Sequence, residues 1–192
     1  MKRGFTLIEI MVAVSIFTIV AIITTGALVT ASDTNRKAQA LKIAMDNVSF
    51  AMDSIVTNLR EGAQFGCITG TIPDNPNGYL TSAQNSGNWL NTGCTIDGQG
   101  LIFESKRSGN IPNYIIYRFK KNAGEFGRVQ VASSISSQYV DLTSQEEVDI
   151  KSLRFYVPNN APKPRVTIVI SGEVPGKTPT KFNLQTTVKA NF

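Results

Sequence analysis

The chain has 192 residues, of which 17% are charged, and a formal net charge of +5. This length accommodates one globular domain and an appended segment, and so mild a net charge does not by itself predict a nucleic-acid partner. Histidine, the usual general base and commonest metal ligand, is absent. No pattern places a nucleophile beside a base, so we expect neither an enzyme nor a bound metal or cofactor.

An apolar segment opens the chain after Lys2 and Arg3. Between Phe5 and Ala31 the only charged residue is Glu9. About 20 apolar residues suffice to span a membrane, and the preceding basic residues favour a cytoplasmic amino end. A cleaved secretory signal is one alternative, but its apolar core is typically about 7–15 residues long. A plain single-pass anchor is another, but it leaves unexplained a carboxylate that is costly inside a spanning segment.

The pattern becomes amphipathic beyond residue 31, and 32–61 is expected to continue the same helix. Apolar residues then recur at alternating steps of four and three, which indicates one buried helical face. These residues are Leu41, Met45, Val48, Met52, Ile55 and Leu59. Gly62 is a plausible end of the helix. The first half is therefore predicted to be apolar on all sides and the second half on one face.

The remainder, residues 62–192, is predicted to be a β-rich head. Residues 62–100 are rich in turn-forming residues, and we expect them to form a long connecting loop. Runs of strand length separated by turn residues follow. The predicted strands are 101–106, 113–121, 127–133, 152–158, 165–172 and 181–192. An antiparallel sheet packed on the helix stripe would bury both elements, which predicts an α+β fold.

Two cysteines, Cys67 and Cys94, lie beyond the apolar segment. If that segment spans a membrane, both cysteines are exported. An even pair in an exported domain favours a disulfide. Two free buried thiols are the alternative.

Two further patterns resemble ligand sites in part. The turn-rich stretch at 73–78 lacks the run of acidic ligands and the late glutamate of a calcium loop. Basic and aromatic residues interleave at 114–128, as in some surfaces that bind single-stranded nucleic acid. However, alternation places Tyr117 and Phe119 on one face and Arg118 and Lys120 on the other. That is the pattern of a half-buried strand, so a nucleic-acid partner is not expected.

The opening stretch KRGFTLIEIMVAVSIF resembles the amino terminus of a type IV prepilin or a type II secretion pseudopilin. The resemblance implies that a membrane-embedded prepilin peptidase removes residues 1–4 by cutting between Gly4 and Phe5. The same enzyme would then methylate the new amine of Phe5. Glu9 matches the glutamate of the family, which would pair with the amine of a neighbouring subunit during assembly. Pairing with its own amine, or a place among lipid headgroups, is the alternative.

The resemblance also implies a fold, partners and location. It predicts a pilin-like fold and a minor pilin or J-type minor pseudopilin, a structural part of a type IV pilus or type II secretion pseudopilus. Partners would be the peptidase, other subunits and an inner-membrane assembly platform. The protein would lie in the bacterial inner membrane, with its head outside the cytoplasm, before entering a periplasmic pseudopilus or extracellular pilus. Alternatives are a major pilin or a pilin-anchored protein that binds DNA, carbohydrate or an exoprotein. In similar proteins a helix breaker often lies near the position of Gly26; close helix packing at small residues is the other interpretation.

Overall fold

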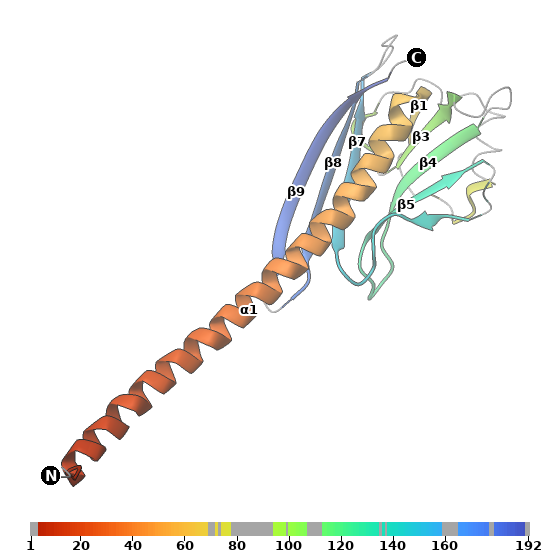
Figure 1. Cartoon of the computed structure of the whole chain (residues 1–192). Coiled ribbons are helices and arrows are strands. Elements are labelled where there is room, and N and C mark those ends of the chain that lie inside the picture. The colour runs from red at the N-terminus through yellow and green to blue at the C-terminus, as the bar shows by residue number, and fades with distance from the viewer. Residues whose placement is uncertain are drawn as a thin grey trace. The chain divides into compact units, whose positions relative to one another are not determined.

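The computed structural model describes residues 4–68, 72, 74–77, 94–98, 100–106, 113–134, 136, 138–158, 165–176 and 179–190 (Figure 1). The chain divides into two compact units, Met1–Ala40 and Leu41–Phe192. A single helix, α1 (Leu7–Arg60), contributes to both. This helix confirms the predicted long amino-terminal element.

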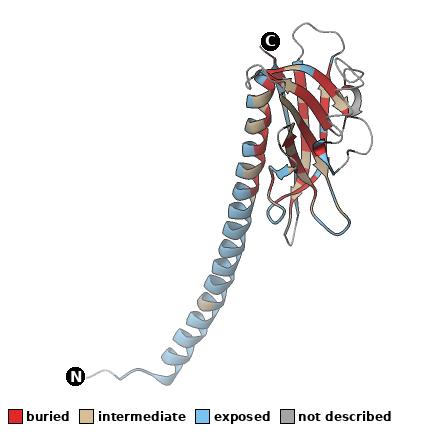
Figure 2. Cartoon of the chain, turned by 90° about the vertical axis from the view of Figure 1, so that its right-hand side faces the viewer, coloured by how far each residue is buried: buried red, intermediate tan, exposed pale blue. Residues whose placement is uncertain are grey.

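The part of α1 that belongs to the second unit buries one face (Figure 2). Four residues of the predicted stripe, Val48, Met52, Ile55 and Leu59, are buried. The two earlier members of the stripe, Leu41 and Met45, are half-buried and pack against the same core. The steps of four and three therefore mark the face that contacts the head.

The strands form two antiparallel sheets rather than the single sheet that we expected. The five-stranded sheet A has the order β1-β3-β4-β5-β6, and the four-stranded sheet B has the order β2-β7-β8-β9. Sheet A contains β1 (Gly62–Ile68), β3 (Gly100–Ser105), β4 (Asn113–Lys120), β5 (Arg128–Ser133) and β6 (Val140–Asp141). Sheet B contains β2 (Cys94–Gly98), β7 (Asp149–Val157), β8 (Arg165–Val174) and β9 (Thr180–Lys189). All six predicted strands are confirmed within a few residues.

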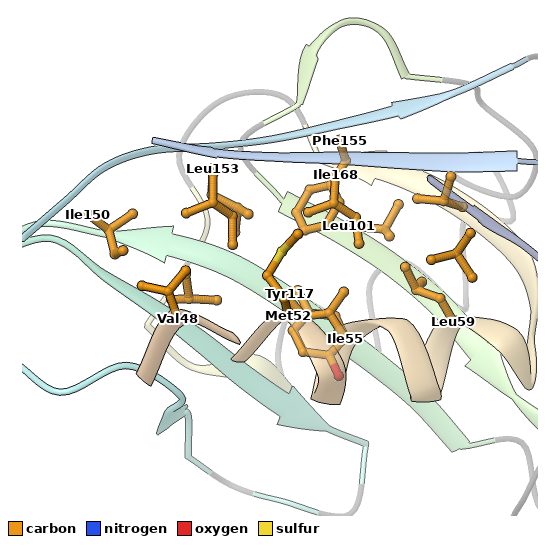
Figure 3. Close-up of a cluster of buried hydrophobic side chains, with 14 of the residues drawn as sticks. Val48, Met52, Ile55, Leu59, Leu101, Tyr117, Ile150, Leu153, Phe155 and Ile168 are labelled. Carbon is orange, nitrogen blue, oxygen red and sulfur yellow. The ribbon is translucent and has the colours of Figure 1, made fainter. Parts of the chain in front are cut away.

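One hydrophobic core joins the end of α1 to both sheets (Figure 3). Val48, Met52, Ile55 and Leu59 of the helix face a set of side chains from both sheets. Sheet A supplies Leu101 and Tyr117, and sheet B supplies Ile150, Leu153, Phe155 and Ile168. Full burial of such a side chain stabilises a fold by about 1.5–3 kcal/mol. The helix therefore covers the inner faces of both sheets.

Tyr117 adds a polar link within this core. Its side chain is fully buried, and its hydroxyl accepts a hydrogen bond from Asn58 Nδ2 at 2.7 Å. Burial raises the pKa of the Tyr117 hydroxyl above its usual value, although hydrogen bonding to the helix opposes the rise. The neutral hydroxyl thus ties β4 to α1 without an unpaired polar group.

The predicted loop at 62–100 is wrong at both ends. Residues 62–68 form β1 and residues 94–98 form β2. The strand β1 is difficult to recognise in the sequence because it is irregular. Its pairing with β3 shifts register between Ala63 and Gly66. Gln64, inside this bulge, has a φ of 53°. A bulge interrupts the two-residue alternation by which strands are recognised. Residues 69–71, 73 and 78–93 lie outside the described part of the chain.

A tight junction joins the turn before β5 to the start of β7. The Ile150 N–H donates to Gly127 O at 2.9 Å, and the Gly127 N–H donates to Asp149 Oδ1 at 2.8 Å. Asp149 is 5% exposed and is paired with Lys121 and Lys151. Burial alone would raise the pKa of Asp149, but the bonds from Lys151 and Gly127 outweigh it and hold the pKa below its ordinary value. The junction therefore carries an ionised, fully bonded carboxylate between the sheets.

A disulfide makes a second link between the sheets. Cys67 lies in β1 of sheet A and Cys94 lies in β2 of sheet B, and the structure joins them. The two cysteines are 27 positions apart in the chain. The bond therefore fixes both ends of the segment between β1 and β2 and ties the edge strand of one sheet to that of the other.

Gly127→Ala is expected to destabilise the head. A Cβ at residue 127 would lie 2.0 Å from Ile150 O, and this backbone atom cannot move without breaking the junction. We expect a loss of about 2–3 kcal/mol, measured by chemical denaturation of the full chain in neutral detergent. Gly176→Ala, where a Cβ meets nothing within 4 Å, is the control. Equal stability of the two variants would contradict the close approach.

Replacing both cysteines with alanine is expected to lower the free energy of unfolding by about 3–4 kcal/mol. The reason is that the disulfide joins two residues 27 positions apart and so lowers the conformational entropy of the unfolded chain. The same denaturation experiment measures the effect, and reduced wild-type protein should show a similar loss. A double variant as stable as the oxidised wild type would show that the cross-link between the sheets is dispensable.

Candidate processing and assembly site

The peptide bond between Gly4 and Phe5 lies outside the helix. Residues 4–6 are non-helical, and α1 begins at Leu7. A Cβ on Gly4 would meet nothing within 4 Å, so packing does not require glycine here. Phe5 is 79% exposed. A protease that binds its substrate in extended form would therefore reach this bond without first unwinding α1.

Glu9 occupies the first turn of the helix. The backbone N–H groups of Glu9 and Ile10 donate to Thr6 O at 3.1 and 3.4 Å. The spacing from Thr6 to Glu9 is that of a capping box, in which a glutamate at the third helical position supports the start of a helix. A carboxylate there also interacts favourably with the helix dipole. The sequence analysis did not consider this spacing, although the Thr-x-x-Glu pattern is visible in the sequence.

The described residues contain no partner for the charge of Glu9. Within the described residues Glu9 forms no ion pair, and its side chain is exposed. The structure contains one copy, so the pairing with a neighbouring amine stays a prediction. The structure does place Glu9 beside Phe5, at the same end of the first unit.

Most of the helix in the first unit is exposed (Figure 2), and its large apolar residues are among the exposed ones. Large hydrophobic residues from Phe5 to Val29 are 53–79% exposed. Within the described part of the chain, α1 is the one helix long and apolar enough to cross a membrane, with a mean hydropathy of 2.6 over its best window. Apolar surface on this scale must be covered by lipid or by other apolar helices.

Six hydroxyl groups in this unit are satisfied within the helix. Each donates to the carbonyl oxygen four residues earlier, at 2.7–3.0 Å. The donors are Ser15, Thr18, Thr24, Thr25, Thr30 and Thr34. A polar group left unsatisfied in hydrocarbon costs several kcal/mol. The serines and threonines of the apolar segment are therefore compatible with burial in lipid.

Gly26 lies within an unbroken helix. Small side chains around it leave a shallow apolar groove along this face of α1. The groove is lined by Thr18, Ala21, Ile22, Thr25, Gly26 and Val29. Small residues of this kind let helix backbones approach closely in membranes.

The basic and aromatic residues of β4 are less exposed than their alternation suggests. Tyr117 is in the core as predicted, but the opposite face is not open to solvent, because Arg118 is only 3% exposed. Its guanidinium lies 3.6 Å from the ring of Tyr139 and donates to Gln130, Ile72 O and Asp74. Ile72 and Asp74, which are remote in the sequence, therefore contact this face of the strand, and the sequence of the strand does not show these contacts.

Asp74, from the stretch weighed as a calcium loop, instead pairs with two cations. Its Oδ1 accepts from Lys120 Nζ at 2.8 Å and from Arg118 Nη2 at 2.9 Å. These bonds lower the pKa of the Asp74 carboxyl. Among the described residues, no three acidic or cysteine side chains lie close enough together to hold a metal ion. Residues 73 and 78 lie outside the described part.

Comparison with known proteins identifies the amino terminus. Residues 1–25 match the family model described as the prokaryotic N-terminal methylation motif. Searches of curated proteins and of solved structures find no significant match to the chain. The motif implies processing by a prepilin peptidase and assembly with other pilins, and the apolar helix that it opens fits membrane anchoring. The motif indicates a type IV prepilin-like family, and the α+β arrangement of a long apolar helix on antiparallel sheets agrees with a pilin-like architecture.

Proposed function

We propose that this protein is a minor pilin or minor pseudopilin, a structural subunit of a type IV pilus or type II secretion pseudopilus. The observation that carries the proposal is the non-helical Gly4–Phe5 bond directly before a helix that is apolar on every side. Removal of residues 1–4 leaves a new amine at Phe5. The choice of a minor subunit rests on the strand layout and the spacing of apolar residues from Val166 to Ile170.

The two environments of such a subunit explain the composition of α1. Before assembly, lipid covers the segment from Phe5 to Ala31 in the inner membrane, with Lys2 and Arg3 in the cytoplasm. After extraction by the assembly platform, the apolar segments of neighbouring subunits cover one another. The disulfide supports a head outside the cytoplasm, because disulfides persist in oxidising compartments.

Glu9 is proposed to set the register of assembly. Among packed apolar helices its carboxylate is tolerated only when paired with a cation. The amine of Phe5 on a neighbouring subunit supplies that cation. A subunit that enters the filament out of register would leave both charges buried without partners. The Glu9–Phe5 ion pair therefore favours the correct register over all others.

The mature protein is expected to begin at N-methylated Phe5. Mass spectrometry of the protein purified from membranes of cells that contain a prepilin peptidase measures its start. Gly4→Val should retain the leader, because its side chain would occupy space in the peptidase cleft that glycine leaves free. Gly26→Ala should be processed like the wild type. A mature chain that begins beyond Ala31 would identify a secretory signal peptide instead.

Glu9→Gln is expected to be cleaved normally but incorporated at least about tenfold less into sheared filaments. The glutamine retains the capping-box position and removes only the charge, so the amine of Phe5 is left without its partner. An unpaired buried charge costs about 3–5 kcal/mol. Immunoblots of filament and membrane fractions measure incorporation. Asp33→Asn, the same change elsewhere on α1, is the control.

The comparison with Glu9→Ala separates the two roles of this residue. If the alanine variant fails while the glutamine variant assembles normally, Glu9 serves the start of the helix and the charge-pairing role is wrong.

A further inference from the structure

Strand β9 forms a long open edge of the head. Sheet B ends at β9, which pairs with β8 on one side and with no other described strand (Figure 1). Its pairing with β8 runs from Thr180 to Lys189 without a register shift. Among the described residues, none forms a backbone hydrogen bond with the other side of β9. Alternate residues of β9 therefore present free N–H and C=O groups at this edge.

The other edges of the two sheets are short or closed. Strands β1 and β2 are edge strands, and the disulfide joins them. Strand β6, the remaining edge of sheet A, has only two residues. Proteins usually protect a long edge strand with a proline, a bulge or a charge within the strand. The middle of β9, residues 182–188, contains none of these. Among the described strands, β9 is therefore the edge best suited to accept another strand.

The two faces of β9 also suit an added strand. Phe182 and Val188 point into the core and are buried, whereas Leu184 between them is only half-buried against the same core. Inward side chains of a strand paired beyond β9 would complete the coverage of Leu184. On the opposite face Asn183 and Gln185 are exposed and uncharged. This face therefore accepts polar cross-strand neighbours without burying a charge.

The charge at one end of β9 indicates the chemistry of the occupant. Arg165 of β8 lies directly opposite Lys189 of β9, and both side chains are exposed. Neither forms an ion pair with any of the described residues. Like charges placed directly opposite each other destabilise a sheet. At the other end of the same strands the charges are matched, because Lys181 lies opposite Glu173. A carboxylate on an added strand beside Lys189 would offset the unmatched positive charge.

A second copy of β9 is a poor occupant of this edge. Full antiparallel overlap of two β9 strands about Gln185 would place Lys181 of each strand opposite Lys189 of the other. Both ends of the ladder would then carry like-charged pairs, which destabilise it. An extended segment with a carboxylate near its end has the opposite effect at Lys189. Charge complementarity therefore favours a different chain over a second copy.

We infer that the free edge of β9 accepts an extended segment of a different protein, which adds a further strand to sheet B and places a carboxylate beside Lys189. In strand addition of this kind, hydrogen bonds of the main chain supply affinity and alternate side chains supply specificity. The inference concerns the head alone, and it does not depend on the proposed role in a filament.

Strand addition is tested with the full chain in neutral detergent and a synthetic peptide. The peptide has about ten residues of alternating threonine and valine, to match the length of β9. A glutamate near each end lets one carboxylate meet Lys189 in either strand direction. Residue-resolved hydrogen exchange should show that alternate amides of β9 exchange rapidly in the free protein. Saturating peptide should slow this set by at least about tenfold, and a peptide with methylated alternate backbone nitrogens should not.

Lys189→Glu tests the charge complementarity. It should weaken binding of the glutamate peptide by about three- to tenfold, and a peptide with lysine in place of glutamate should recover that loss. The melting temperature of this variant should not fall, because the change converts the like-charged pair with Arg165 into an opposite-charged pair. Lys42→Glu makes the same change on the exposed surface of α1 and should bind within about twofold of the wild type.

Several results would overturn the inference. Equal loss of binding in the Lys189 and Lys42 variants would show a general charge effect. Binding without protection of the amides of β9, or equal binding of the methylated peptide, would exclude strand addition at this edge. Absence of binding at about 1 mM peptide would exclude even a weak site. Protection of β9 in the peptide-free protein that rises with protein concentration would identify a second copy as the occupant.

Discussion

The free-energy cost of exposing an apolar helix to water governs this protein. From Phe5 to Val29 the helix has no hydrophilic side, so it must lie in lipid or among similar helices. The later turns of α1 meet the same requirement internally, because both sheets of the head cover one face. The helix α1 therefore lies in two different surroundings: lipid or other helices around its first part, and the head against its later turns. Its composition changes from apolar on all sides to apolar on one face between these parts.

Within the head, the helix and two inter-sheet links hold the sheets as one unit. The core buries side chains from α1, sheet A and sheet B together. The disulfide ties β1 to β2, and the junction at Gly127 and Asp149 ties the turn before β5 to β7. A subunit that is pulled from a membrane into a filament has to transmit force through its head. Covalent and buried links between the two sheets suit that task.

The charged residues divide into three groups by their surroundings. Arg118 and Asp149 are buried and fully engaged, so they stabilise the head. Glu9 lies in the first helical turn with its side chain exposed, and none of the described residues pairs with its charge. Arg165 and Lys189 oppose each other on an open face. A contribution to the stability of the head explains only the first group. Charged residues that do not stabilise the fold, as in the other two groups, are typical of functional positions.

The sequence by itself determined the long helix, its buried stripe and most of the strands, because these follow from periodicities that local geometry imposes. It also predicted a processing site at Gly4 and Phe5 and an assembly role for Glu9, because a linear recognition motif can be read without the fold. Only the tertiary structure decided that the strands form two sheets, that residues 62–68 are a strand, and that Arg118 is covered. It also decided that Arg165 faces Lys189, which are 24 positions apart in the chain. Bulges, strand pairing and coverage by distant segments depend on contacts between remote residues, and no local pattern encodes them.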